Sequence, residues 1–502
     1  MVLTGLLLSQ ASEFGKDIFM GWKYGASMLS DGFFSAFSPI FLIYTTLLLS
    51  SSIVLIPAFV DHIENDDNQS SNLFYESTAF LIVLLGILSL VLFYFSDSII
   101  AFLAPGLSEQ SKLIAVNFFK RFIWVLMPTG CIAISASFLR SNNMLFIPST
   151  LKFVGNVFFI LILFYFSSSF EALSYAAISM FLMQFIFLVV FLFKTNLAFP
   201  THFIPSKKTL NILLLFIIPI LSIFMSQTVV LSERYYSSML QEGSVSIIAY
   251  IGRIYSGFVN LIGGTVMGTA LPALSGYISK GNFVNARDTI TWNIKIVITV
   301  CLPASILLMI MAEPIISTIF SGSALTQVQM EMSYRVLSCY SIGIVFGAIM
   351  PLYTAVFSAY RSYSLILMGS TFFLVTNWLI NALLINHVNI LSLPIARTLS
   401  NIAVSIPMFL VMQKKVGKIF NIELLIFFIK VLAASLFMGL IVYYFQTILT
   451  DHCIIDSMMK KSGTILLSFL IAGIVFFVSC LILKMDNCLQ IYFLITKKLR
   501  IS

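Results

Sequence analysis

Long apolar stretches alternate with short polar ones along nearly the whole chain. About fourteen of these stretches are long enough to cross the roughly 30 Å hydrocarbon core of a bilayer as helices. We predict spans at 3–24, 31–60, 78–104, 115–140, 146–168, 171–193, 208–236, 243–276, 286–312, 331–359, 363–386, 390–413, 422–447 and 463–484. The first is the weakest, because Glu13, Lys16 and Asp17 interrupt it and hydropathy alone would miss it. The pattern predicts an all-α polytopic membrane protein.

Composition supports this class. The 502-residue chain is 59% apolar and 10% charged, and its mean hydropathy is +1.03, whereas soluble domains carry roughly 25% charged residues. The net charge of +8 does not indicate a nucleic-acid partner, because no basic run is interleaved with aromatic residues. The six cysteines form no CxxC pair and mostly lie in apolar runs, so they indicate core packing rather than a metal site or a disulfide framework.

The lysines and arginines between the spans predict the orientation of the chain. Loops after even-numbered spans, together with the C-terminal tail, carry Arg140, Lys194, Lys207, Lys208, Lys280, Arg287, Arg361, Lys414, Lys415, Lys418, Lys484, Lys497, Lys498 and Arg500. Loops after odd-numbered spans carry little beyond Lys112, Lys460 and Lys461. Because cytoplasmic loops of membrane proteins are enriched in Lys and Arg, we predict that both termini are cytoplasmic.

The two halves of the chain resemble each other. LIPAFVDHI at the end of the second predicted span matches ALPALSGYI at the end of the eighth, so Pro57 pairs with Pro272, and we expect both prolines to terminate or kink their helices. SDSIIAFLAPGLSEQ matches AEPIISTIFSGSALTQ, and SFLRS, which contains Arg140, matches SAYRS, which contains Arg361. The offset stays at about 215 to 221 residues, which chance similarity between apolar segments would not produce.

The repeat predicts the architecture. Each copy holds six spans, and an even number of spans keeps both copies in the same orientation. We therefore expect two parallel six-helix lobes, 1–200 and 201–418, followed by 419–502 with two extra helices and a basic cytoplasmic tail. Duplicated parallel halves are typical of transporters, whose substrate site lies between the halves near the middle of the membrane.

Charged residues inside the predicted membrane segments indicate where that site lies. The first span of the first half carries Glu13, Lys16 and Asp17, and the corresponding part of the second half carries Glu233 and Arg253. Lys16 and Arg253 would give a hydrated cavity a positive charge, which suits phosphate or pyrophosphate because Arg offers such groups a bidentate fork. The alternative is that these cations only pair with the nearby acids and hold the halves together.

A second set of polar residues has the composition of a cation site. Asn377 and Asn381 are four residues apart and share a helix face, and Thr398 lies on the next span. With Glu233 they would offer oxygen ligands to a monovalent ion. Ordinary hydrogen bonding between membrane helices is the alternative, and the cation Arg397 beside Thr398 favours that alternative.

The chain has no motif of an enzyme that would supply energy. GxxxxGK[ST], HExxH and GxSxG are all absent from the sequence, and we predict neither catalytic activity nor an organic cofactor. Transport must then be driven by an ion gradient, the membrane potential or the substrate gradient, with Na⁺ or H⁺ as the candidate coupling ion.

Several motifs resemble those of one known family. YGASMLSDGFFSAF followed by LIPAF resembles the first two spans of the MurJ (MviN) lipid II flippases, which belong to the multidrug/oligosaccharidyl-lipid/polysaccharide (MOP) exporter superfamily. GSVSIIAYIGRIYSGFVNLIGGTVMGTALPALSGYISKGN is similar to the family's seventh and eighth spans, and LAPGLSEQ, SFLRSNN and SAYRS also fit. The resemblance runs from about Ser9 to Leu384. It implies a protein of the bacterial inner membrane that moves undecaprenyl-pyrophosphate-linked envelope precursors outward, as peptidoglycan synthesis requires.

The resemblance also implies roles for individual residues. Lys16 and Asp17 match an Arg–Asp pair of the family's first span, Asp31 matches the acid that opens the second span, and Arg253 matches a cavity arginine of the eighth. These four would bind substrate. The residues that approximate the family's sodium site are Glu233, Asn377, Asn381 and Thr398.

The chain departs from the family pattern at five positions. Gln10 replaces an arginine of the first span, Ile43 and Tyr44 replace a basic pair of the second, and Ser256 replaces an acid one turn after Arg253. Asn381 stands where the family's sodium site has an aspartate. The predicted cavity is therefore less cationic than the family pattern implies.

The sequence favours a flippase for lipid II or a related lipid-linked oligosaccharide that works by alternating access. Its partners would be the lipid-linked saccharide pyrophosphate, membrane lipids and, as a further expectation, envelope-synthesis enzymes. Two alternatives remain: a cation-coupled exporter of drugs or small molecules from the same superfamily, and a non-transporting membrane scaffold for envelope synthesis. The lost arginines fit the scaffold best, whereas the duplicated lobes favour transport.

Overall fold

The chain folds into helices throughout the part that the structure describes. The computed structural model describes residues 2–65, 67–166, 168–195, 197, 205–419, 421–452 and 458–485, and no strand occurs among them. Contacts divide the chain into an N-terminal unit, Met1–Tyr250 with Ser323–Leu325, and a C-terminal unit, Ile251–Gly322 with Thr326–Ser502. The basic tail predicted beyond 485 lies outside the described residues.

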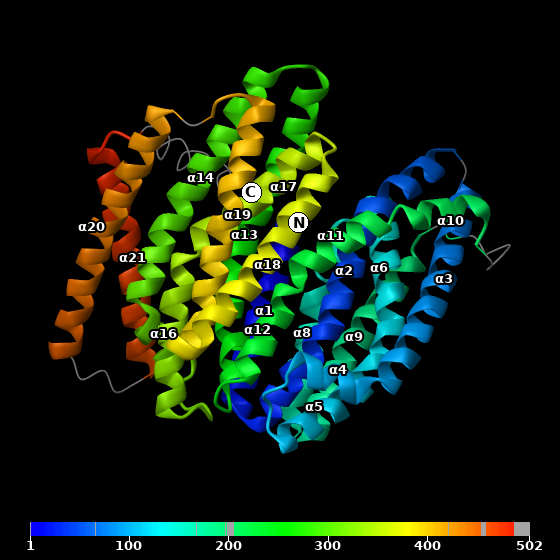
Figure 1. Cartoon of the computed structure of the whole chain (residues 1–502), viewed down its shortest axis with the longest axis horizontal. Coiled ribbons are helices and arrows are strands. Elements are labelled where there is room, and N and C mark those ends of the chain that lie inside the picture. Colours follow the sequence, from blue (N-terminus) through cyan, green and yellow to red (C-terminus); the bar gives the residue numbers. More distant parts are fainter. Residues whose placement is uncertain are drawn as a thin grey trace. The chain divides into compact units, whose positions relative to one another are not determined.

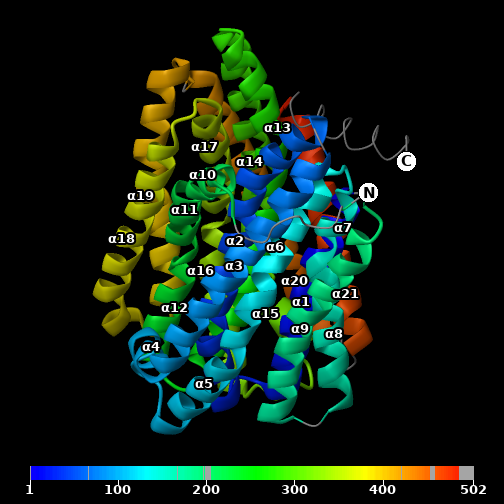
Figure 2. The same cartoon turned by 90° about the vertical axis from the view of Figure 1, so that its right-hand side faces the viewer.

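The described part of the N-terminal unit contains twelve α-helices and the beginning of a thirteenth, α13. Their bounds are α1 Val2–Tyr24, α2 Met28–Asn65, α3 Asp67–Tyr94, α4 Ser96–Leu103, α5 Glu109–Phe122, α6 Leu126–Ser141, α7 Phe146–Ser149, α8 Leu151–Tyr165, α9 Phe170–Leu192, α10 Lys207–Leu214, α11 Ile217–Gln227 and α12 Val229–Ser238, with a 3₁₀ turn η1 at Ile123–Val125. Figures 1 and 2 show α2, α3, α6 and α9 running alongside one another, with α6 packed against the other three.

Aromatic packing joins the segment α10–α11 to the rest of this unit. The Phe138 ring on α6 meets Phe59 of α2 edge-on, with 5.2 Å between ring centroids, and lies 5.2 Å from Phe74 of α3. Leu213, near the end of α10, and Phe216, between α10 and α11, are buried in the same cluster. Because large rings bury much apolar surface, this cluster fixes the start of the seventh predicted span against α2 and α3.

The C-terminal unit contains the remaining helices of the described chain. Their bounds are α13 Ser244–Ser279, α14 Phe283–Ile310, α15 Ala312–Ile319, α16 Gln327–Ile342, α17 Ile344–Ala359, α18 Tyr363–Val388, α19 Ser392–Val416, α20 Ile422–His452 and α21 Met458–Ile482, with a 3₁₀ turn η2 at Asn389–Leu391. Helix α20 packs against α14 on one side and α21 on another, and Figure 1 shows α14, α20 and α21 close together. Helices α18 and α19 form a second closely packed pair.

Many of these helices are suited to a bilayer. Among the described residues, ten helical stretches are long and apolar enough to cross a membrane, and α16 with α17, bent by 46° at Gly343, would make eleven. Helix α1 is not among them because of its charged residues, yet it is continuous over 23 residues, as expected of the weakest predicted span. Helix α8 is shorter, with 15 residues.

One match of the internal repeat corresponds to a pair of similar helix arrangements. In each half a 28-residue helix, α3 or α14, leads directly into an eight-residue helix, α4 or α15. The paired prolines lie inside continuous helices, since α2 extends past Pro57 and α13 past Pro272. Neither proline therefore terminates its helix, because neighbouring groups in a membrane bundle can compensate for the hydrogen bond that a proline removes.

Candidate functional site

Two charged residues of α1, Lys16 and Asp17, form a buried ion pair. The Lys16 ammonium lies 2.9 Å from an Asp17 carboxylate oxygen, and only 4% and 3% of the two side chains are exposed. The Lys16 nitrogen also lies 5.4 Å from the centroid of Phe37 on α2 and 5.2 Å from that of Phe159 on α8. The aromatic faces attract the cation, and the carboxylate balances its charge in a poorly solvated place.

A lysine that was not among the predicted site residues pairs with the other acid of α1. Lys152, at the beginning of α8, lies 2.9 Å from Glu13 and 5.8 Å from the Phe41 ring centroid. Its side chain is 29% exposed, far more than that of Glu13. Glu13 and Lys16 have helical spacing that would let them pair, but the structure shows Glu13 with Lys152 and Lys16 with Asp17. The only sequence signal for Lys152 was a cation at the start of a short apolar segment.

Neutral hydrogen bonds surround the position in α2 where the family resemblance implied a basic pair. The hydroxyl of Tyr44, which is fully buried, donates to the side-chain oxygen of Gln184 on α9, with 2.7 Å between oxygens. On α8, the Asn156 amide donates to the hydroxyl of Ser12 at 3.1 Å. Polar groups therefore line the junction of these helices without adding charge.

Asp31 contacts the beginning of α13 rather than the α1 pair. Its carboxylate accepts hydrogen bonds from the backbone N–H of Gly243 at 2.7 Å, from the N–H of Ser246 at 2.8 Å, and from the Ser246 hydroxyl. A carboxylate at a helix N-terminus satisfies N–H groups that the helix itself cannot, and the helix dipole favours its negative charge. Asp31 thus fixes α2 to the start of the helix that carries Arg253.

The acid and the base at the end of the seventh predicted span are both buried on α12. Arg234 donates from Nε to the Ser38 hydroxyl at 3.0 Å and from Nη1 to the Val245 carbonyl at 2.8 Å, and its guanidinium carbon lies 5.5 Å from the Phe34 ring centroid. Glu233 is 3% exposed. Arg234 therefore joins α12 to α2 and α13, a role that its position next to an acid did not predict.

Arg253 lies on the part of α13 that belongs to the C-terminal unit, and it is half-buried. Ser256, which stands where an acid was expected, donates its hydroxyl hydrogen to the Arg253 carbonyl oxygen at 3.2 Å. Two residues beyond Arg253, Tyr255 stacks on Tyr340 with 5.1 Å between ring centroids, and the Arg397 guanidinium lies 5.0 Å from the Tyr255 ring centroid. Arg397 is thus engaged with an aromatic ring near Arg253 in the sequence.

The two asparagines of the candidate ion site lie together. The Asn381 side-chain amide donates to the Asn377 carbonyl at 3.0 Å and to the Asn377 side-chain oxygen at 3.1 Å, and both residues are fully buried. Thr398, also buried, is on α19, which packs against α18. Glu233, the fourth predicted member of this set, lies in the N-terminal unit and the other three in the C-terminal unit.

The fold is that of a MOP superfamily transporter. A structure described as an inward-facing conformation of a multidrug resistance MATE family transporter of that superfamily matches with a TM-score of 0.70 and 16% identity, covering 82% of this chain and 94% of the other. The structure of a lipid II flippase, MurJ, in an inward closed conformation matches with a TM-score of 0.80 and 19% identity, covering 97% and 99%.

The sequence comparisons define the family within that class. The profile described as "Lipid II flippase MurJ" matches residues 23–462. A probable lipid II flippase MurJ of Buchnera aphidicola (from Acyrthosiphon pisum) is 28% identical over 453 residues, 87% of each chain, and that of Aquifex aeolicus is 23% identical over 485 residues, covering 93% of this chain and 92% of the other. The chain belongs to the MurJ lipid II flippase family, a family of transporters rather than of catalytic enzymes.

Proposed function

We propose that this protein moves lipid II across the bacterial inner membrane by alternating access. The observation that carries the proposal is the family match over residues 23–462, and the named relatives, probable lipid II flippases, support it. The two MATE transporter conformations match at 16% and 14% identity, a likeness of fold alone that does not favour drug export. Nor does any of these comparisons favour a scaffold without transport.

We further propose fourteen spans in two parallel six-helix lobes, 1–200 and 201–418, with two more helices and a basic tail in 419–502. The eleven candidate spans counted with the bent pair α16–α17 support this number once α1 and α8 are added and the joined stretch Tyr363–Val416 is divided into α18 and α19. Basic loops after the even-numbered spans support cytoplasmic termini.

In this mechanism the pyrophosphate of lipid II is held by Lys16 and Arg253. Lys16 would exchange its partner Asp17 for a phosphate oxygen, and Arg253 would offer two parallel N–H donors. Asp17 orients the lysine and balances its charge while substrate is absent. Asp31, on α2, would hold the start of α13, the helix that carries Arg253. The lipid-linked saccharide and the surrounding lipids are the partners of this cycle, and envelope-synthesis enzymes are further candidate partners.

Replacing Arg253 by alanine is expected to abolish lipid II translocation, because the neutral side chain offers no donors to the pyrophosphate. Translocation is measured by the accessibility of lipid II to an external probe in proteoliposomes containing the purified full-length protein. Arg253→Lys should retain a part of the rate, since it keeps the charge but loses the fork. Arg335→Ala is the matched control, because Arg335 pairs with Glu331 on an exposed face of the same unit.

Two outcomes would contradict the proposal. Lack of translocation by the wild-type protein, in liposomes where a known lipid II flippase is active, would contradict the flippase assignment itself. Full translocation by Arg253→Ala, at equal amounts of protein in the membrane, would contradict the role of Arg253 alone.

We propose Na⁺ as the coupling ion, with H⁺ as the alternative. If the Asn381 side-chain amide rotates by half a turn, its oxygen takes the place of its nitrogen and faces the side-chain oxygen of Asn377. The two oxygens repel each other, and a monovalent cation bound between them would remove this repulsion. Thr398 and Glu233 would supply further oxygens.

Replacing Na⁺ by K⁺ should therefore slow lipid II translocation, and Asn381→Ala should make the rate equally slow in both ions. The measurement is the same proteoliposome assay at constant ionic strength. Thr371→Ala is the matched control on α18, since Thr371 is exposed and its hydroxyl donates to the Leu367 carbonyl of its own helix. If the wild-type rate did not depend on Na⁺ but responded to an imposed proton gradient, the proposal that Asn377 and Asn381 bind a coupling Na⁺ would be wrong.

A further inference from the structure

The C-terminal unit contains a polar cavity whose lining includes none of the proposed transport residues. It has a volume of about 460 Å³ and lies between the beginning of α14 and the segment that joins α19 to α20. Three cations, Arg287, Lys295 and Lys418, and two acids, Asp288 and Glu423, line it. The proposed lipid II cycle uses none of these five residues, so the cavity requires its own explanation.

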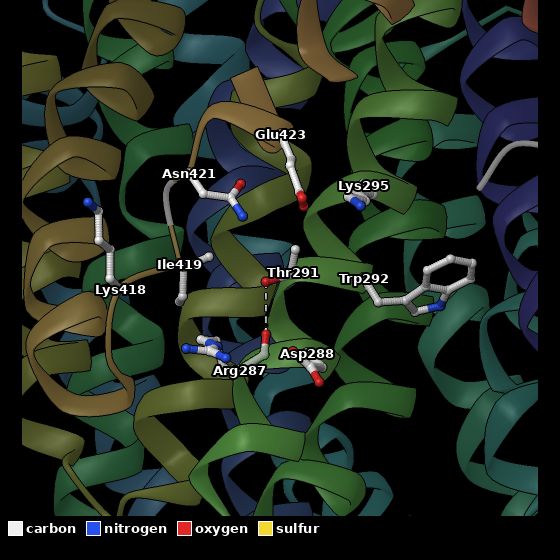
Figure 3. Close-up of a pocket in the computed structure, with 9 residues that line it drawn as sticks. All are labelled: Arg287, Asp288, Thr291, Trp292, Lys295, Lys418, Ile419, Asn421 and Glu423. Carbon is white, nitrogen blue, oxygen red and sulfur yellow. Dashed lines mark hydrogen bonds between the residues drawn. The ribbon is translucent and has the colours of Figure 1, made fainter. Parts of the chain in front are cut away.

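The two helices place donors and acceptors on the same cavity. Arg287, Thr291 and Lys295 follow one another at four-residue spacing, so they share one face of α14. The Asn421 side-chain oxygen caps α20 by accepting a hydrogen bond from the Leu424 N–H at 2.9 Å. Figure 3 shows the side chains of Asn421 and Glu423 directed from the start of α20 toward the α14 residues.

The presence of both charges limits the ligand. Guanidinium and ammonium groups bind phosphate oxygens, whereas carboxylates bind the N–H groups of a cation. A purely anionic ligand would meet repulsion from Asp288 and Glu423, and a quaternary ammonium would have no N–H to donate to them. A phosphate joined to a primary ammonium by a short linker satisfies both sets of side chains.

The surroundings of the cavity favour a lipid as the carrier of this group. Directly after Asn421, α20 exposes apolar side chains, among them Ile422 at 73% and Ile429 at 55%. On α14, Trp292 is half-buried at the cavity, and Lys295 lies with its ammonium 5.5 Å from the Phe427 ring centroid. Tryptophan and long cations beside an apolar surface are typical of the level at which headgroups meet acyl chains.

We propose that this cavity binds the phosphoethanolamine headgroup of a bilayer phospholipid. Arg287 and Lys295, with Lys418, hold the phosphate, and Asp288 and Glu423 hold the primary ammonium. The acyl chains lie along the exposed apolar side chains of α20. Basic pockets between membrane helices bind anionic headgroups. In this cavity the carboxylates of Asp288 and Glu423 shift the preference to a zwitterionic headgroup.

The test is lipid binding to the delipidated full-length protein in detergent, measured by native mass spectrometry. The probes are phosphatidylethanolamine, phosphatidylglycerol and phosphatidylcholine, together with water-soluble glycerophosphoethanolamine. Phosphatidylethanolamine should bind more tightly than the other two lipids. The soluble analogue should bind much more weakly, because it lacks the acyl chains. Equal affinity for the soluble analogue would overturn the assignment to a lipid, and tighter binding of phosphatidylglycerol would overturn the zwitterionic preference.

Substitutions locate the site. Loss of one charge-assisted hydrogen bond should weaken phosphatidylethanolamine binding about tenfold or more in R287Q and in K295Q. E423Q should remove the preference for phosphatidylethanolamine over phosphatidylglycerol. Lys280→Gln is the matched control, because Lys280 is exposed and does not line the cavity.

Arg287 is exposed, so R287Q tests the site without disturbing the packing of α14. Wild-type affinity in both R287Q and K295Q would overturn the proposal. Since none of these measurements involves lipid II, their failure would leave the proposed transport function unaffected.

Discussion

Replacing Lys16 by alanine is expected to abolish lipid II translocation and to lower the thermal stability of the protein. The substitution removes the ammonium that lies 2.9 Å from the buried Asp17 carboxylate. Breaking a buried ion pair by removing one partner typically costs about 3 to 5 kcal/mol, because the remaining charge is poorly solvated. The measurements are the midpoint of thermal unfolding in detergent and the rate of translocation in proteoliposomes.

The double variant Lys16→Gln with Asp17→Asn separates the two effects. It removes both charges and keeps similar side-chain shapes, so the midpoint of unfolding should return close to that of the wild type. Translocation should stay absent, because the neutral amide offers the pyrophosphate no positive charge. If the double variant transported lipid II at the wild-type rate, Lys16 would serve only to pair with Asp17, and its assignment to the substrate would be wrong.

The features that could be predicted from the sequence depend on local patterns. Apolar stretches long enough to cross a bilayer became helices, and even α1 was predicted despite its charges. The match between SDSIIAFL and AEPIISTI became two helices of equal length, α4 and α15. The length of an apolar stretch and the similarity of two repeated segments are both properties of consecutive residues, so a single sequence is enough to find them.

The partners of the buried charges could not be predicted in the same way. Spacing alone puts Glu13 within reach of Lys16, but Lys152 from a distant helix is the residue that pairs with Glu13. Asp31 was expected to face substrate, and its bonds to Gly243 and Ser246 depend on packing between segments more than 200 residues apart. Such contacts depend on how distant helices pack, and the hydrophobic periodicity of one sequence does not specify which residues then meet.

Replacing Asp31 by alanine is expected to loosen the beginning of α13. Because α13 carries Arg253, the rate of lipid II translocation should fall as well. The carboxylate accepts hydrogen bonds from the Gly243 and Ser246 N–H groups and from the Ser246 hydroxyl. A buried donor left without an acceptor costs about 1 to 3 kcal/mol, so the loss should exceed that of most single substitutions. Hydrogen–deuterium exchange of a peptide covering 243–246 should become faster, and the midpoint of thermal unfolding should fall.

The controls distinguish this positioning role from direct contact with substrate. Asp31→Asn keeps one acceptor oxygen and should show an intermediate exchange rate. Ser246→Ala keeps both backbone N–H bonds to Asp31 and removes the hydroxyl, which bonds to Asp31 and to the Ser30 hydroxyl. Ser244→Ala is the matched control, because among the described residues the buried Ser244 hydroxyl has no hydrogen-bond partner. If Asp31 acted on substrate alone, Asp31→Ala would stop translocation while exchange at 243–246 stayed at the wild-type rate. Because α13 also carries Arg253, the structure predicts that exchange at 243–246 becomes faster in step with the loss of translocation. This order should hold across Asp31→Ala, Asp31→Asn and Ser246→Ala.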